Sequence, residues 1–199
     1  MISERMDMTD HPFAFTLPLP EGVPSRVDNH IKRTLSSMRG QYLDEKAYEQ
    51  QLSRGDITVY EVYELKGSEE AGELLMGVSV VHPGKVGNEF HMTKGHFHTV
   101  RETAEVYYCL KGEGFMVMET SEGGTAVEPM LPGKVLYVSP SWAHRSVCTS
   151  RQQDLVMFFA YPGNAGHDYA TIEKRGFRKI ILDGEDGISI VDNPRWRTP

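Results

Sequence analysis

Thr93-Lys94-Gly95-His96-Phe97-His98 places two histidines one residue apart, with Glu105 shortly after them and His144 much further along the chain. On an extended strand, His96 and His98 point to the same side, because side chains alternate with a period of two. With Glu105 and His144 they make a His₃Glu set, which suits Fe(II), Mn(II), Ni(II) or Zn(II) and leaves coordination positions open for a substrate. The pattern predicts a catalytic metal site.

A pair of histidines one residue apart can also be a solvated strand face. Here the ligand candidates stand among strand runs and turns: Glu105–Leu110 leads into Lys111-Gly112-Glu113-Gly114, and Pro132-Gly133 opens a second run ahead of His144. Because this context fits ligands on adjacent strands, we favour the metal site.

From Ile57 onward the chain reads as short strands separated by turns, a pattern typical of a sandwich or barrel. Helices are predicted over Tyr42–Leu52 and Tyr169–Arg175, the latter ended by Gly176. Residues 1–28 read as an extended, proline-rich arm. The expected strands are Ile57–Leu65, Leu74–Val81, Glu89–Thr93, Glu105–Leu110, Phe115–Thr120, Ala126–Met130, Val135–Ser139, Leu155–Tyr161, Lys179–Leu182 and Ile188–Val191.

Composition narrows the class of protein. The 199 residues are 39% hydrophobic and 25% charged, as in an ordinary globular domain. We expect one structural domain, with an arm and helix over residues 1–55 packing on a barrel over 56–199. A net charge of -7 argues against a nucleic-acid partner. The N-terminus lacks the pattern of a signal peptide, and no apolar run reaches membrane-spanning length, so we expect a cytoplasmic protein without membrane contact. Cys109 and Cys148 are expected to be buried, reduced thiols.

Two spaced motifs resemble those of the cupins: His96-x-His98-x₆-Glu105-x₆-Gly112, and Gly133-x₆-Pro140-x₃-His144. The resemblance implies an all-β double-stranded β-helix (jelly-roll) barrel with a few short helices. The interval before Glu105 is longer than is common in cupins, so Glu102 is an alternative ligand. Glu105 is preferred because it opens the apolar strand.

Five segments together resemble a narrower family, the archaeal-type phosphoglucose isomerases. They are Pro83-Gly84-Lys85-Val86-Gly87, Thr93-Lys94-Gly95-His96-Phe97-His98, Trp142-Ala143-His144-Arg145, Ala165-Gly166-His167-Asp168-Tyr169 and Asp192-Asn193-Pro194-Arg195-Trp196. The resemblance implies interconversion of glucose 6-phosphate and fructose 6-phosphate in a homodimer. It also implies one divalent metal per subunit. Fe(II) is the expected ion, and Mn(II), Ni(II) and Zn(II) are the alternatives.

The same resemblance implies roles for individual residues. Ser79, Thr93 and Gly95 match a phosphate site, and Glu105 is a candidate base, although a metal-assisted hydride shift would need none. Catalytic assistance is expected from His167 and Tyr161. The sugar pocket would be lined by Tyr60, Tyr107, Tyr161, His167 and Tyr169.

Other interpretations stay open at this stage. Tyr60 and Tyr107 suit a barrel core equally well, and Lys85 and Lys94 are either phosphate contacts or solvated surface residues. His11, His30, His82 and His91 are given no function. A cupin dioxygenase with the same ligands, or a sugar-binding cupin without turnover, is the alternative function.

The arm carries its own expectation. Phe13, Phe15, Leu17 and Leu19 alternate, as a strand burying one face would require. The segment from Thr9 to Pro24 is therefore expected to cover a sheet edge of its own barrel or of a second subunit.

Overall fold

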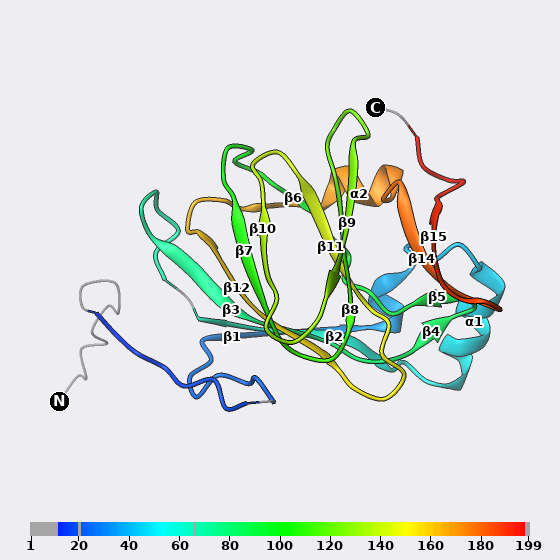
Figure 1. Cartoon of the computed structure of the whole chain (residues 1–199), viewed down its shortest axis with the longest axis horizontal. Helices are drawn as coiled ribbons and strands as arrows, with labels where there is room; N and C mark the ends of the chain where they lie inside the picture. Colours follow the sequence, from blue (N-terminus) through cyan, green and yellow to red (C-terminus); the bar gives the residue numbers. More distant parts are fainter. Residues whose placement is uncertain (1–11, 20, 66, 198–199) are drawn as a thin grey trace.

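The computed structural model describes residues 12–19, 21–65 and 67–197. Short strands dominate it, and of its two α-helices one lies at an end of the molecule and the other nearer the middle (Figure 1). The helices are α1 (Glu45–Arg54) and α2 (Tyr169–Arg175). The strands are β1 (Asn29–Thr34), β2 (Thr58–Leu65), β3 (Leu74–Val81), β4 (Lys85–Val86), β5 (Glu89–Phe90), β6 (Phe97–His98), β7 (Glu105–Lys111), β8 (Gly114–Glu119), β9 (Thr125–Met130), β10 (Val135–Val138), β11 (Ala143–Cys148), β12 (Leu155–Pro162), β13 (His167–Asp168), β14 (Lys179–Gly184) and β15 (Gly187–Asp192).

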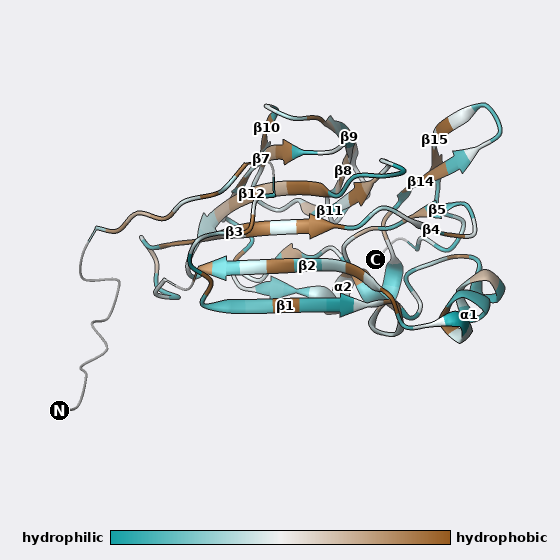
Figure 2. Ribbon diagram, turned by 90° about the horizontal axis from the view of Figure 1, so that it is seen from below, coloured by the Kyte–Doolittle hydropathy of each residue, from teal (hydrophilic) through white to brown (hydrophobic). Residues whose placement is uncertain are grey.

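Two antiparallel sheets form the barrel. The larger has the order β1-β2-β3-β12-β7-β10, and the smaller has the order β11-β8-β9. Figure 2 looks onto β1, β2, β3 and β12 of the larger sheet, lying side by side. One core cluster joins Cys109 and Met157 of the larger sheet to Met116 and Val147 of the smaller one. The expected cupin barrel is confirmed.

Strand β7 shows how the sequence pattern selects the buried face. Glu105, Tyr107 and Cys109 are buried, whereas Val106 and Tyr108 between them are exposed. This is the alternation of a strand with one face on a core. Glu105 therefore enters the barrel as the first inward-facing residue of its strand. Cys109 and Cys148 are buried and free, as expected.

The segment after β5 was predicted incorrectly. We expected a strand over Glu89–Thr93, but the regular strand ends at Phe90. Beyond it the chain leaves β4 and β14 and pairs with β11: Cys148 N donates to the His91 carbonyl at 2.9 Å, and Thr93 N donates to the Ser146 carbonyl at 2.9 Å. Five further strands were not expected: β1, β4, β6, β11 and β13. All of them except β4 pair with a strand that is distant in the sequence.

Helix α1 begins three residues later than predicted. The Asp44 side chain accepts a hydrogen bond from Ala47 N at 2.8 Å, so Asp44 is the N-cap rather than a residue of the first turn. Tyr42 is buried in the core instead. The prediction of a helix over Tyr169–Arg175 is confirmed, and Gly176 with φ 71° ends it.

The arm lies across the outer face of the larger sheet. Leu17 packs against Val78, Val80 and Val156 of β3 and β12. Phe13 and Leu19 are 45% and 68% exposed, so the four alternating apolar residues do not bury a common face within this chain. The part of the predicted segment before Pro12, including His11, and residue 20 lie outside the described residues. Among those described, no helix has the length and apolarity needed to cross a membrane.

A buried ion pair connects α2 to the smaller sheet. Arg175 Nη2 donates to Glu119 Oε1 at 2.7 Å, and Arg178 N donates to Glu119 Oε2 at 2.6 Å. Glu119 is fully buried and Arg175 is 7% exposed. A buried charge is costly unless it is paired and hydrogen-bonded, so each partner depends on the other.

We predict that Arg175→Met lowers the free energy of unfolding by about 3–5 kcal/mol, because it leaves the Glu119 carboxylate buried without its counter-charge. Urea unfolding followed by circular dichroism measures this change. Arg151→Met is the matched control: Arg151 is also paired with a carboxylate, Asp183 at 3.4 Å, but its side chain is 81% exposed. Equal stability of the two variants would contradict the prediction.

Candidate metal centre and substrate pocket

Three strand segments bring the predicted metal ligands together. His96 forms an isolated antiparallel bridge with His144 of β11, in which each backbone N–H donates to the other residue's carbonyl, at 3.3 Å and 3.1 Å. His98 follows on β6, and Glu105 opens β7. The positive φ of Gly95, 72°, turns the chain just before His96. A Cβ there would lie 2.5 Å from the Phe177 ring and 2.9 Å from Arg145 Cβ, so the fold requires glycine.

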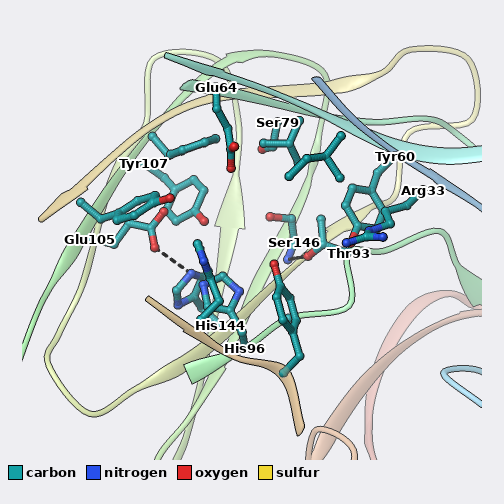
Figure 3. Close-up of a pocket in the computed structure, with 17 residues that line it drawn as sticks. Arg33, Tyr60, Glu64, Ser79, Thr93, His96, Glu105, Tyr107, His144 and Ser146 are labelled. Atoms are coloured by element: carbon teal, nitrogen blue, oxygen red, sulfur yellow. Dashed lines mark hydrogen bonds and ion pairs between the residues drawn. The ribbon is translucent and has the colours of Figure 1, made fainter. Parts of the chain in front are cut away.

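The four side chains converge on one point. One ligand atom from each of His96, His98, Glu105 and His144 lies within 4.8 Å of the others. Glu105 Oε2 is 2.9 Å from His144 Nε2 and 3.1 Å from His98 Nε2. His98, Glu105 and His144 are all buried. Figure 3 shows Glu105, His96 and His144 together at one end of a pocket.

The donor set fits a divalent metal. His96 Nε2 is buried and has no hydrogen-bond partner among the described residues, and His144 Nε2 faces only the Glu105 carboxylate. Buried polar atoms are normally satisfied, so an unpaired imidazole nitrogen beside two further imidazoles and a carboxylate marks a ligand position. Three imidazoles with one carboxylate are an ordinary donor set for a divalent transition metal. Glu102, the alternative ligand, is exposed and outside the cluster.

The electrostatics of the cluster favour ligand forms. Burial, followed by the neighbouring His144, holds the pKa of His96 well below its usual value, so its imidazole is neutral. Burial alone would raise the pKa of Glu105, but His144 and His98 lower it below the ordinary range, and the carboxylate is ionised. Neutral imidazole and ionised carboxylate are the forms that bind metals.

A further contact orients one ligand. His98 Nδ1 lies 2.8 Å from Thr103 Oγ1 and 3.2 Å from the Thr103 carbonyl. A proton on Nδ1 satisfies the carbonyl and leaves Nε2 free toward Glu105. Such contacts set the tautomer and the ring orientation of a metal-binding histidine.

A pocket extends from this cluster toward β1, β2 and β3. Every residue predicted for the phosphate and sugar sites lines it: Tyr60, Ser79, Thr93, Gly95, Tyr107, Tyr161, His167 and Tyr169. His167 packs edge-on to His96, with ring centroids 4.3 Å apart, and lies 5.4 Å from the Tyr161 ring. Burial lowers the pKa of His167 to about 4, so its imidazole is neutral near pH 7.

Sequence reasoning missed three polar residues of this pocket: Arg33, Glu64 and Ser146. Arg33 precedes the first strand that we expected, and Ser146 lies on β11, which was not predicted at all. Glu64 was inside a predicted strand, but nothing in the alternation distinguishes it from a solvated residue. Its carboxylate accepts a hydrogen bond from Asn29 Nδ2 at 2.6 Å.

The remaining candidates lie elsewhere. Lys94 pairs with Glu173 at 3.0 Å, Lys85 pairs with Asp183, and neither lysine lines the pocket. The other histidines that were assigned no function and are described here, His30, His82 and His91, are also outside the pocket and the ligand cluster.

Fold and site together define a cupin with a His₃Glu ligand cluster at the inner end of a polar pocket. A family model described as glucose-6-phosphate isomerase matches residues 32–197. The chain belongs to the glucose-6-phosphate isomerase family.

Relatives of that name align over nearly their whole length. The protein of Thermococcus gammatolerans is 48% identical over 93% of this chain and 96% of its own. That of Pyrococcus abyssi is 46% identical over 84% and 88%, and that of Pyrococcus horikoshii 43% identical over 96% and 100%. A solved oxalate oxidase superposes with a TM-score of 0.48 at 14% identity, covering 59% of this chain and 58% of its own. The family assignment rests on the sequence relatives.

We predict that His144→Ala reduces bound divalent metal from about one per chain to a small fraction, because the site loses one of its four protein ligands. Metal content after gel filtration, measured by mass spectrometry, tests this. His30→Ala, which removes an exposed histidine outside the cluster, is the control and keeps its metal. Acidification should release metal from the unaltered protein, since protons compete for the imidazole ligands. Stoichiometric metal in His144→Ala would refute the ligand assignment.

Proposed function

We propose that this chain interconverts glucose 6-phosphate and fructose 6-phosphate in the pocket, with one divalent metal bound by His96, His98, Glu105 and His144. The observation that carries the proposal is the joining of a His₃Glu cluster to a polar pocket in a member of this family. The hydroxyl groups of Ser79, Thr93 and the pocket tyrosines suit a polyol phosphate. They do not suit the apolar substrate that a cupin dioxygenase would need.

Fe(II) is the metal we propose first, with Mn(II), Ni(II) or Zn(II) as alternatives. When bound, such an ion would supply Lewis-acid polarisation of the substrate oxygens on C1 and C2, the two carbons whose oxidation states change. The mixed nitrogen and oxygen donor set supports each of these ions and disfavours Mg²⁺ or Ca²⁺, which prefer oxygen ligands alone.

Proton handling is assigned to Glu105, His167 and Tyr161. Glu105 is ionised and is the candidate base for the C2 hydrogen, provided that it loosens from the metal when the sugar binds; a hydride shift is the alternative. His167 is neutral at pH 7 and is suited to accept the hydroxyl proton released on ring opening. Burial raises the pKa of Tyr161 far above neutrality, so its phenol stays protonated and donates a hydrogen bond.

Two hydroxyl groups support the phosphate assignment. The Ser79 side-chain oxygen is buried and has no partner among the described residues. Thr93 Oγ1 accepts a hydrogen bond from Ser146 N at 3.1 Å, which leaves its own proton free to donate into the pocket. Gly95 adds a backbone N–H at the same wall.

We predict that the purified protein converts fructose 6-phosphate, loses this activity on chelation, and regains it with one of the four ions. A coupled assay of glucose 6-phosphate formation measures all three steps. Unphosphorylated fructose should be turned over far more slowly, because the interactions with the phosphate are lost. Turnover that survives complete metal removal would refute the metal dependence, and equal rates for fructose and fructose 6-phosphate would refute the phosphate site.

We also propose a cytoplasmic homodimer, in which the arm contributes to the contact. The exposed Phe13 and Leu19, flanking a Leu17 that packs on the sheet, support an arm that reaches beyond its own barrel. Sheet edges and apolar residues of this kind are usually covered.

We predict that the full-length protein is a dimer by light scattering at micromolar concentration, and that deleting residues 1–24 shifts it toward the monomer. A monomeric full-length protein would refute the dimer. A deletion variant that remains dimeric would instead assign the contact to the barrel face and leave the arm as a cover for β3 and β12.

A further inference from the structure

We propose that Arg33 binds the phosphate of the substrate and thereby fixes which end of the sugar faces the His₃Glu cluster. The inference rests on the proposed function and adds a specificity-determining residue to it. Neither a motif nor the predicted strand pattern pointed to this position, because β1 lies before the first predicted strand.

The register of β1 directs Arg33 into the pocket. Arg33 pairs with Tyr60 across β1 and β2, and the register shifts immediately after it, between Arg33 and Thr34. Along β1, His30 and Lys32 are exposed, whereas Ile31 and Arg33 are partly buried and line the pocket. In Figure 3 the Arg33 guanidinium lies beside Tyr60, at the same end of the pocket as Thr93 and Ser146.

Arg33 is the one lysine or arginine among the described residues that line this pocket. Glu64 and Glu105 also line it, and the chain carries a net charge of -7, so a phosphate dianion requires a local positive charge. Lys85 and Lys94, the cations expected from the sequence, are paired with Asp183 and Glu173 outside the pocket. Within the described residues no carboxylate forms an ion pair with Arg33.

The groups around Arg33 complete a phosphate site. A guanidinium donates two parallel hydrogen bonds to phosphate oxygens, and hydroxyl donors can fill the remaining acceptor positions. Thr93 offers its free proton, and the unpartnered Ser79 hydroxyl lies on the neighbouring wall. One charged donor and two neutral donors at one end of the pocket match a phosphate monoester better than a hydroxyl of the sugar.

The position of Arg33 also determines how the substrate is oriented in the pocket. Arg33 lies beside Tyr60 and Thr93, away from the end of the pocket that holds Glu105 (Figure 3). The ligand cluster is at the buried end, where Glu105 and His144 are each 2% exposed. A phosphate held at Arg33 therefore leaves the carbonyl end of the sugar facing the ligand cluster.

The experiment compares Arg33→Gln, Arg33→Lys and Lys32→Gln. Lys32 is the neighbouring residue on β1 and is exposed, so Lys32→Gln removes the same charge from the opposite side of the strand. The Michaelis constant for fructose 6-phosphate and the inhibition constant of inorganic phosphate are measured for each. Metal content and melting temperature are recorded first, and Arg33→Met replaces Arg33→Gln if the latter does not fold.

Arg33→Gln should raise the Michaelis constant roughly tenfold to a hundredfold, the range expected for losing a hydrogen bond to a charged group, and should weaken phosphate inhibition in parallel. Its metal content should not change. Arg33→Lys should recover part of the loss, because it restores the charge without the planar fork, and Lys32→Gln should match the unaltered protein.

Two outcomes overturn the inference: an Arg33→Gln protein with unaltered constants for both ligands, or Lys32→Gln causing an equal loss, which would reduce the effect to general charge. Failure of the proposed function looks different, since the unaltered protein would then not convert fructose 6-phosphate at all. Phosphate binding by the unaltered protein and by Arg33→Gln, measured calorimetrically, would still test Arg33 in that case.

Discussion

The backbone bridge between His96 and His144 is the constraint on which the site depends. Two hydrogen bonds hold residues 48 positions apart directly opposite each other, which brings both imidazoles to one face of the barrel. Gly95 permits the preceding turn, and two further main-chain bonds, from Thr93 N to the Ser146 carbonyl and from Cys148 N to the His91 carbonyl, extend the pairing. Because these are main-chain bonds, ligand positions are determined by the barrel and not by flexible loops.

Charge is separated along the pocket. The inner end holds the neutral imidazole of His96, whose pKa is lowered by burial and by the neighbouring His144, and the ionised carboxylate of Glu105, whose pKa is lowered by His144 and His98. The end of the pocket away from Glu105 holds the Arg33 guanidinium, which comes from β1 of the larger sheet. A substrate with a polarisable carbonyl at one end and a dianion at the other is complementary to this arrangement. Such complementarity determines the orientation of the substrate in addition to contributing to its affinity.

Much of the barrel could be predicted from alternation and turn residues. The helix over Tyr169–Arg175 and the strand over Leu74–Val81 agree residue for residue, because each is bounded by strong local signals. Predictions were wrong where pairing decides the structure. The strand from Glu89 ends at Phe90 since its continuation bonds to β11, and β1 was missed because its partner β2 begins 24 residues after β1 ends. Strand pairing between segments that are distant in the sequence has little effect on the local sequence pattern of either strand.

For the site, the sequence by itself indicated the three histidines and preferred Glu105 as the carboxylate, because the one-residue step between His96 and His98, the strand opened by Glu105 and the turn before His144 are local patterns. It also indicated the polar residues that line one wall, through the family resemblance. Only the tertiary structure decided between Glu102 and Glu105, removed Lys85 and Lys94 from the pocket, and brought Arg33 into it. Those outcomes depend on which face of a strand meets which neighbour, and the register that sets this is fixed by contacts across the whole barrel.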